Sequence, residues 1–225
     1  IGSECDGGFA DYVTVAARHA YPVETALSDA ELASFPCSYS TAENMLTRAQ
    51  VTKNDTLLIT GASGGVGSAA IQLAKARGAQ VIAVAGDKKQ HSVRDAGADQ
   101  ALVRGASLEA ALGENSVDVV IDLVGGEDWP ELLTILTPFG RYAVSGAIAG
   151  PIVELDLRTL YLKDQRFLGC TVLDDGVFSR LVGLIEEGDI QPLLARSFAL
   201  ESLSEAQAFF LDKQFTGKLV IDMAL

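Results

Sequence analysis

The sequence predicts an α/β fold built around a doubly wound parallel sheet. Strand-like and helix-like segments alternate from Asn54 onward. The strand-like segments are continuous apolar runs, which is the pattern expected where helices cover both faces of a sheet. A glycine-rich loop at residues 61–67 joins the first of these strands to the helix that follows. These three observations together favour parallel strands connected by helices over an antiparallel or all-helical fold.

Composition and charge narrow the class of protein. The 225 residues are 48% hydrophobic and 21% charged, close to globular averages, and the chain is long enough to bury a core. The net charge of −13 would repel phosphates, so we expect neither nucleic acid nor a membrane surface as a partner. No apolar run approaches the roughly 20 residues of a membrane span.

The cysteines and the first residues indicate the cellular context. Cys5, Cys37 and Cys170 are odd in number and far apart, which argues against a secreted disulfide framework. We therefore expect reduced thiols and a cytoplasmic location. Residues 1–6 contain no initiator methionine and no signal segment, so we interpret the sequence as entering a longer chain part-way.

The first 50 residues precede the alternating pattern. Aromatic and β-branched residues after a glycine turn predict a strand over residues 9–15. Two short helices follow, the first at residues 29–32 capped by Ser28 and the second at 41–49. Cys37 is predicted to lie at the turn between them.

The remaining elements follow in order. Apolar runs predict strands, and segments with helical periodicity between and after them predict helices. The last elements either complete the sheet or return the chain to a second domain. The strands are expected at residues 57–60, 80–85, 100–103, 117–124, 141–145 and 218–221, and the helices at 67–77, 88–96, 131–136, 177–187 and 203–213.

The glycine loop is the clearest candidate site. Glycines at such a turn allow a tight bend, close approach of the backbone to a pyrophosphate and close packing of the helix on the strand. The amino end of the helix adds free N–H groups and a positive dipole end. Ala62 replaces the first glycine of a strict GxGxxG pattern, and a plain tight turn is the alternative. The predicted dinucleotide-binding residues are Gly61, Ala62, Ser63, Gly64, Gly65, Val66 and Gly67.

The second strand bears on the choice of coenzyme. NAD-binding sites usually carry an acidic residue about 20 residues after the loop, where it holds the ribose hydroxyls. Here the strand ends in Ala85 and Gly86, followed by Asp87, Lys88 and Lys89. The apolar end and the two lysines just beyond it favour NADP(H) over NAD(H). Asp87 reaching back to the ribose is the alternative, which would favour NAD(H).

Several segments in their order resemble the medium-chain dehydrogenase/reductase superfamily. They are DGGFADYV at residues 6–13, PCSYST at 36–41, ITGASGGVG at 59–67, DLVGG at 122–126 and GKLV at 217–220. The resemblance implies a Rossmann dinucleotide-binding domain combined with part of a GroES-like, β-rich catalytic domain. It assigns residues 1–50 to the partial catalytic domain and connecting helices, 51–185 to the Rossmann domain and 186–225 to the return to the catalytic domain. The superfamily's proton relay and other zinc-ligand motifs have no counterpart here, so the catalytic residues are expected in an absent N-terminal segment.

The resemblance also implies roles for individual residues. Cys37 occupies the position of a thiolate ligand to catalytic zinc in zinc-type alcohol dehydrogenases, whereas the alternative is a small buried hydrophobe. One ligand builds no stable site, so we expect this chain to bind zinc poorly or not at all, although a full-length protein could hold it. Thr41 falls against the nicotinamide, and Val124, Gly146 and Ala147 line the same pocket.

Three functions remain open at this point. The first is an NAD(P)-dependent oxidoreductase that transfers hydride between nicotinamide and an alcohol, aldehyde or ketone, as in zinc-type alcohol dehydrogenases. The second is a zinc-independent NADPH quinone oxidoreductase or enoyl reductase. The third is a non-catalytic nucleotide-binding fragment. Residues 152–161 resemble the segment through which the superfamily's Rossmann domains pair, so we expect a homodimer or homotetramer acting on a small carbonyl or alcohol substrate.

Overall fold

The structure, a computed structural model, describes residues 5–212 and 214–225. The chain forms two compact units. One unit is Cys37–Phe178, and the other combines the segment before Cys37 with Ser179–Leu225. Each unit is described below by itself.

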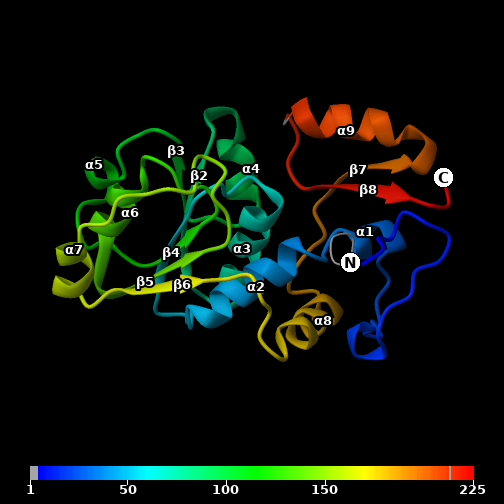
Figure 1. Cartoon of the computed structure of the whole chain (residues 1–225), viewed down its shortest axis with the longest axis horizontal. Helices are drawn as coiled ribbons and strands as arrows, with labels where there is room; N and C mark the ends of the chain where they lie inside the picture. Colours follow the sequence, from blue (N-terminus) through cyan, green and yellow to red (C-terminus); the bar gives the residue numbers. More distant parts are fainter. Residues whose placement is uncertain (1–4, 213) are drawn as a thin grey trace. The chain divides into compact units, whose positions relative to one another are not determined.

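The unit Cys37–Phe178 is built on a parallel sheet of six strands, which confirms the predicted fold class (Figure 1). The strand order is β3-β2-β1-β4-β5-β6, and every neighbouring pair is parallel. The chain runs outward from β1 to β3 and then returns to β4, so the order reverses between β1 and β4. The strands are β1 (Thr56–Ile59), β2 (Gln80–Ala85), β3 (Gln100–Val103), β4 (Val117–Asp122), β5 (Leu136–Val144) and β6 (Arg166–Gly169).

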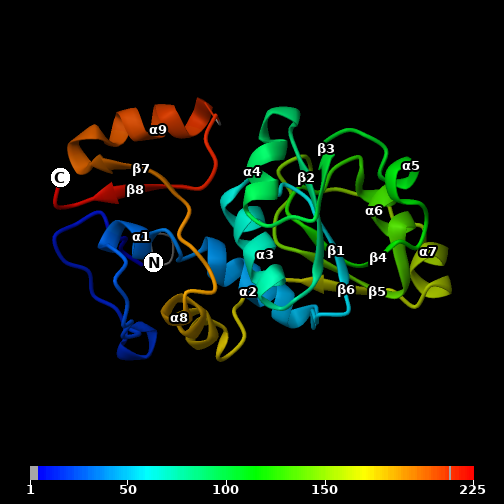
Figure 2. The same cartoon turned by 180° about the vertical axis from the view of Figure 1, so that it is seen from behind.

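Helices connect these strands and cover the sheet. Because parallel crossovers are right-handed, the reversal places the helices before β3 on one face and those after it on the other. Figure 2 views the molecule from behind and shows α3 and α4 in front of the strands. The helices of this unit are α2 (Ser38–Arg48), α3 (Gly65–Ala76), α4 (Gln90–Asp95), α5 (Leu108–Leu112), α6 (Trp129–Ile135) and α7 (Leu157–Leu162), with a 3-10 turn η2 (Asp87–Lys89) before α4.

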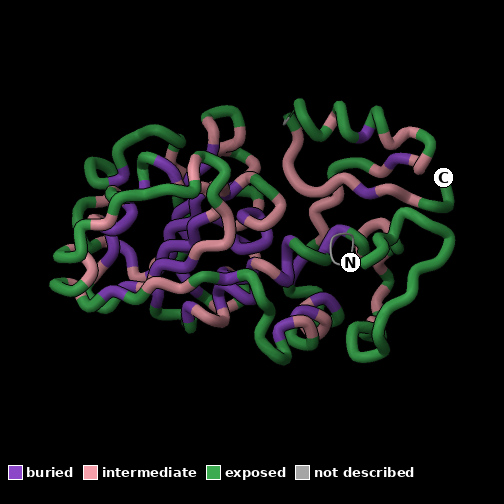
Figure 3. Tube along the Cα trace, viewed as in Figure 1, coloured by how far each residue is buried: buried purple, intermediate pink, exposed green. Residues whose placement is uncertain are grey.

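The core of this unit lies between the sheet and its helices, and Figure 3 shows the buried residues concentrated there. On the α5 and α6 face, Leu58, Val120 and Tyr142 from neighbouring strands pack against Trp129 and Leu132 of α6. The ring of Trp129 meets that of Tyr142 edge-on, with the ring centres 5.9 Å apart. This packing fixes the carboxyl ends of the central strands, where a ligand site is expected in such sheets.

The second unit contains a small parallel pair of strands, β7 (Leu194–Ala199) and β8 (Lys218–Asp222). Ser28 caps α1 (Asp29–Ala33) as predicted, since its side chain accepts a hydrogen bond from the Glu31 amide. The Glu31 carboxylate accepts from the Ser28 amide in return, at 2.8 Å. The other elements are η1 (Ala17–His19), η3 (Leu200–Ser202), α9 (Leu203–Asp212) and α8 (Val177–Glu187), which starts at the boundary between the units. The helix predicted over 203–213 ends on Lys213, which lies outside the described residues.

The predicted strand over residues 9–15 is wrong. This segment has no regular secondary structure, and the side chains of Phe9 and Tyr12 are 60% and 93% exposed. A strand needs a neighbour for its backbone N–H and C=O groups, and no described strand pairs with this segment. Its aromatic and β-branched residues indicate a preference for extended backbone only.

Several predicted boundaries also differ from the structure. The predicted strand 117–124 ends at Asp122, because the Asp122 side chain takes the amides of Val124 and Gly125. The predicted helix 131–136 ends at Ile135, and β5 begins at Leu136 rather than at 141. Among the described residues, none of the helices combines the length and the apolar character needed to cross a membrane.

Candidate dinucleotide-binding site

The glycine loop turns the chain from β1 into α3. Gly61 has a positive φ of 58°, which glycine adopts without steric cost. Gly67 lies in the first turn of α3, where a Cβ atom would lie 2.4 Å from the carbonyl oxygen of Gly61. It would also lie 2.6 Å from the Cα of Ala62. Only a glycine at this position therefore lets α3 pack directly against the loop.

Backbone hydrogen bonds hold the loop in this shape. The Ala62 amide donates to the Val84 carbonyl of β2 at 3.1 Å, and the Gly64 amide donates to the Gly61 carbonyl at 3.0 Å. The Ser68 hydroxyl donates to the Gly64 carbonyl at 2.7 Å. Ala62 is completely buried, so its methyl group fits where a stricter motif has glycine. The first amides of α3 have no acceptor one turn earlier within the helix, which suits them to a phosphate.

A cavity of about 340 Å³ adjoins this loop. Its walls come from the carboxyl ends of β1, β2, β3 and β4, next to the point where the strand order reverses. Ligands of open α/β sheets bind in this crevice. Residues that line it include Gly61, Val84, Arg104, Asp122, Val124 and Gly125. A cleft in this position, beside a glycine-rich turn, has the place that the adenosine half of a dinucleotide takes in such folds.

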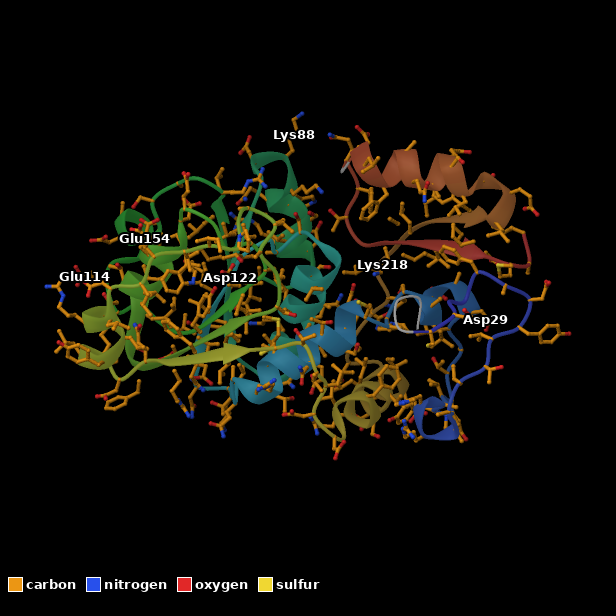
Figure 4. All side chains as sticks on the ribbon, viewed as in Figure 1. Asp29, Lys88, Glu114, Asp122, Glu154 and Lys218 are labelled. Carbon is orange, nitrogen blue, oxygen red and sulfur yellow. The ribbon has the colours of Figure 1, made fainter. Side chains whose placement is uncertain are left out.

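Asp122 organises the strand ends beneath this cavity. Its side chain is fully buried and accepts hydrogen bonds from the Thr60 hydroxyl at 2.6 Å and the Tyr142 phenol at 2.5 Å. It also accepts from the amides of Val124 at 2.9 Å and Gly125 at 3.2 Å. Figure 4 shows Asp122 among the strands rather than at the surface. Asp122 thus fixes the backbone that lines the cavity.

The Tyr142 phenol stays protonated in this network. Burial raises the pKa of Tyr142, and the hydrogen bond and charge of Asp122 raise it further. The phenol therefore acts as a donor, which is what the buried carboxylate needs. In the sequence, Asp122 stands out only as the first residue of the DLVGG motif. Its position as an acidic residue at the end of an apolar strand is the signal that could have indicated its role.

A second cavity lies at the ends of β5 and β6. Its volume is about 290 Å³, and its lining includes Gly146 and Ala147, two residues predicted to contact the coenzyme. Gly125 lines both cavities, so the two adjoin along the carboxyl edge of the sheet. Gly61 and Val124, predicted for the same coenzyme, line the first. The structure thus places these predicted residues along one edge.

Other predicted residues lie elsewhere. Thr41 belongs to α2, where its amide donates to the Cys37 carbonyl at 2.9 Å, and it lines neither cavity described above. Asp87 and Lys88 form part of η2 and line neither cavity. The Lys88 side chain points away from the sheet in Figure 4.

The charged residues of the first cavity that the sequence did not point to include Arg104 and Glu131. Arg104 follows β3 directly, and its amide donates to the Ala85 carbonyl at 2.8 Å. Glu131 of α6 accepts from the Ser107 hydroxyl at 2.5 Å and the Glu109 amide at 3.0 Å. Partial burial works to raise the pKa of Glu131, but these hydrogen bonds outweigh it, so the pKa lies below its usual range. The signal for Arg104 was its place immediately after a parallel strand.

The described residues do not fit a catalytic zinc ion. Cys37 lies at the turn before α2, as predicted, with a φ of 66° and an exposed thiol. Zinc needs three or four ligands, and within the described part of the chain no three His, Cys, Asp or Glu residues are grouped to hold a metal. The exposed thiol also contradicts the alternative of a small buried hydrophobe. Cys170 is buried, which raises the pKa of its thiol, and its carbonyl accepts from Ser145 at 2.6 Å.

Comparison with known proteins now settles the family. Residues 65–187 match the model of the family described as zinc-binding dehydrogenase. The chain belongs to this family. Its expected place in the medium-chain dehydrogenase/reductase superfamily is thereby confirmed.

Three relatives illustrate the zinc-binding dehydrogenase relationship. Acryloyl-coenzyme A reductase of Metallosphaera sedula is 33% identical over 220 residues, which are 97% of this chain and 66% of that protein. Quinone oxidoreductase-like protein 2 of Bos taurus is 32% identical over 99% of this chain and 69% of its own length. A crystal structure from Sinorhizobium meliloti 1021, provisionally named an alcohol dehydrogenase, is 50% identical with a TM-score of 0.90 over 96% of this chain and 62% of its own. The chain thus spans about two thirds of the length of these relatives.

Proposed function

We propose that this chain carries the coenzyme site of an NAD(P)-dependent oxidoreductase, which transfers hydride between nicotinamide and an alcohol, aldehyde or ketone. The observation that carries the proposal is the close packing at Gly67, where a Cβ would lie 2.4 Å from the Gly61 carbonyl oxygen, beside a cavity at the reversal of the strand order. A helix packed this closely on a glycine loop presents its first amides to a pyrophosphate. A bound coenzyme would supply the hydride for reduction of a carbonyl, or accept it on oxidation of an alcohol.

The chain's own residues would bind and orient that coenzyme. In this proposal Gly61, Ala62, Ser63, Gly64, Gly65, Val66 and Gly67 form the pyrophosphate turn. Val124, Gly146 and Ala147 lie toward the nicotinamide. The superfamily resemblance assigns Thr41 to the same group, although Thr41 lines neither of the two cavities described above. The domain assignment to residues 1–50, 51–185 and 186–225 belongs to the same proposal. The groups that move protons during catalysis are not assigned.

The coenzyme we propose is NADP(H) in preference to NAD(H). β2 ends in Ala85, so the last residue of the strand has no carboxylate that would accept from the ribose hydroxyls or repel a 2′-phosphate. The relevant test compares affinity for NADPH and NADH by calorimetry. Tighter binding of NADPH supports the proposal, and tighter binding of NADH refutes this part of it.

A second candidate is a zinc-independent reductase of conjugated carbonyl compounds. It is favoured because, among the described residues, no three His, Cys, Asp or Glu side chains are grouped to hold a metal, at Cys37 or elsewhere. Similarity to proteins named acryloyl-coenzyme A reductase and quinone oxidoreductase points the same way. Metal analysis of the full-length protein separates the two candidates. Stoichiometric zinc that disappears in a Cys37→Ala variant supports a zinc-type dehydrogenase, and full turnover without metal supports the reductase.

A third candidate is a chain that binds nucleotide without turnover. Calorimetry with NADPH and NADH, combined with assays on alcohol and enone substrates, distinguishes it from an enzyme. Binding together with turnover supports an oxidoreductase. If this chain binds coenzyme without turnover and the full-length protein turns substrate over, the catalytic residues lie outside this chain. If the chain does not bind coenzyme, the proposed coenzyme site is refuted.

We further propose a homodimer, or a homotetramer built from it, in the cytoplasm. β6 is an edge strand of the six-stranded sheet, and exposed apolar side chains lie close to it in sequence. They include Ile152, Leu157, Tyr161 and Leu162. An open strand edge with apolar neighbours is a common pairing surface. The three free thiols support a reducing compartment.

A further inference from the structure

We propose that Arg104 is the residue that selects NADP(H), because its guanidinium group binds the 2′-phosphate of the coenzyme. This inference rests on the proposed coenzyme site and assigns its specificity to a residue of the turn after β3. It replaces Lys88, which the sequence pattern favours for the same role.

The backbone of Arg104 is anchored beside the end of β2. Val103 is the register partner of Ala85 in the β2–β3 pair, and the next amide, that of Arg104, donates to the Ala85 carbonyl at 2.8 Å. The Ala106 amide closes a turn by donating to the Val103 carbonyl at 3.1 Å. The Gln90 side-chain amide bridges the two strand ends, donating to the carbonyls of Ala85 at 3.1 Å and Leu102 at 3.0 Å. These hydrogen bonds therefore hold the backbone of Arg104 at the strand end that determines coenzyme specificity.

The charge of Arg104 remains available for a ligand. It is an exposed residue that lines the first cavity, and none of the described carboxylates forms an ion pair with it. Of the acidic residues that share this cavity, Asp122 is held by Thr60 and Tyr142, and Glu131 by Ser107 and Glu109. Asp128 is the third acidic residue of the lining. A guanidinium group matches a phosphate with two parallel hydrogen bonds, which a lysine cannot do.

Lys88 lacks this placement. It lies in η2, outside the lining of the cavity, and its side chain points away from the sheet (Figure 4). The two cations thus flank the same strand end, but only Arg104 lines the cleft. Lys88 is therefore the natural control for charge near β2, and Arg94, an exposed arginine of α4, is the control for loss of an arginine.

Calorimetric titration of this chain with 2′,5′-ADP, 5′-AMP, NADPH and NADH tests the inference without any need for turnover. We expect Arg104→Ala to weaken 2′,5′-ADP and NADPH binding roughly 10- to 100-fold, as loss of a charge-assisted hydrogen bond does. Binding of 5′-AMP and NADH should change less than about threefold. Arg104→Lys should retain part of the preference, and Lys88→Ala and Arg94→Ala should bind like the wild type.

The possible failures are distinguishable. If the wild type binds neither NADPH nor NADH, the proposed function fails and the inference fails with it. If the wild type binds both and Arg104→Ala leaves both affinities unchanged or lowers them equally, the role of Arg104 alone is refuted. A selective loss in Lys88→Ala instead would return the role to Lys88. Circular dichroism confirms that each variant is folded before it is titrated.

Discussion

The phenol of Tyr142 on β5 donates a hydrogen bond of 2.5 Å to the buried carboxylate of Asp122 at the end of β4. The same carboxylate accepts from Thr60, which follows β1 directly. Three neighbouring strands are therefore tied together at the edge where the candidate site lies. A buried carboxylate with this many donors is stable only while all of them are present, because each orphaned donor or acceptor costs free energy.

Removal of the shared acceptor should destabilise the fold more than removal of one donor. We expect Asp122→Ala to lower the free energy of unfolding by roughly 2–4 kcal/mol, since it leaves the buried hydroxyls of Thr60 and Tyr142 without their acceptor. Tyr142→Phe should cost about 1–2 kcal/mol. Urea denaturation measures both, with Asp175→Ala as an exposed control expected to change stability by less than about 0.5 kcal/mol. Equal losses in the two buried variants would contradict a shared acceptor.

Stability should fall at alkaline pH. Burial raises the pKa of both Tyr39 and Tyr142 in the folded chain, whereas an unfolded tyrosine titrates near pH 10. Their contribution is therefore complete below about pH 10 and is lost above it, because only the unfolded chain releases these protons. The expected slope is about 1.4 kcal/mol per pH unit for each tyrosine. Between pH 9 and 11, the unfolding free energy of Tyr39→Phe and of Tyr142→Phe should fall less steeply with pH than that of the wild type. Equal slopes in the wild type and the two variants would contradict this prediction.

Alanine substitutions at two glycines of the same loop should have different effects on stability and coenzyme affinity. At Gly67 a Cβ would lie 2.4 Å from the Gly61 carbonyl, so Gly67→Ala must displace α3 and should lower both the melting temperature and NADPH affinity. At Gly64, where φ is −78°, the nearest atom to a Cβ would be 3.3 Å away, also the Gly61 carbonyl oxygen. Gly64→Ala should therefore fold nearly as stably and lose mainly coenzyme affinity. Thermal unfolding and calorimetry on both variants measure this difference. Unaltered NADPH binding by Gly64→Ala would show that the pyrophosphate does not bind at this loop.

Replacement of the last residue of β2 should alter the coenzyme preference. Ala85→Asp adds a carboxylate at the strand end beside Arg104, where it would repel a 2′-phosphate and accept hydrogen bonds from ribose hydroxyls. We expect NADPH affinity to fall roughly tenfold or more and the NADH/NADPH affinity ratio to rise. Because Ala85 is buried, a melting curve must first show that the variant folds. A folded variant with an unchanged affinity ratio would show that this strand end does not face the ribose.

The sequence was most informative where local chemistry decides the structure. The strand, glycine loop and helix around Gly61 were predicted because backbone geometry and close packing restrict the residue types there. Ser28 was predicted as a cap for the same reason. The roles of Asp122 and Arg104 depend on partners brought together by the sheet, since Thr60 lies 62 residues from Asp122. The strand predicted over residues 9–15 was wrong because a preference for extended backbone cannot supply a neighbouring strand to pair with.

The exposed edge of the sheet leads to a prediction about assembly. β6 is the outer strand, and Leu157 of α7, close to it in sequence, is 64% exposed. If two copies pair along this edge, Leu157→Glu places a charge where apolar surface would be buried and should convert a dimer into a monomer. Leu211 of α9 is 73% exposed but belongs to the other compact unit, so Leu211→Glu is the matched control and should remain dimeric. Light scattering coupled to size-exclusion chromatography measures the mass of each variant. A wild type that is monomeric at high concentration, or a Leu157→Glu variant that stays dimeric, would show that this edge does not form the dimer interface.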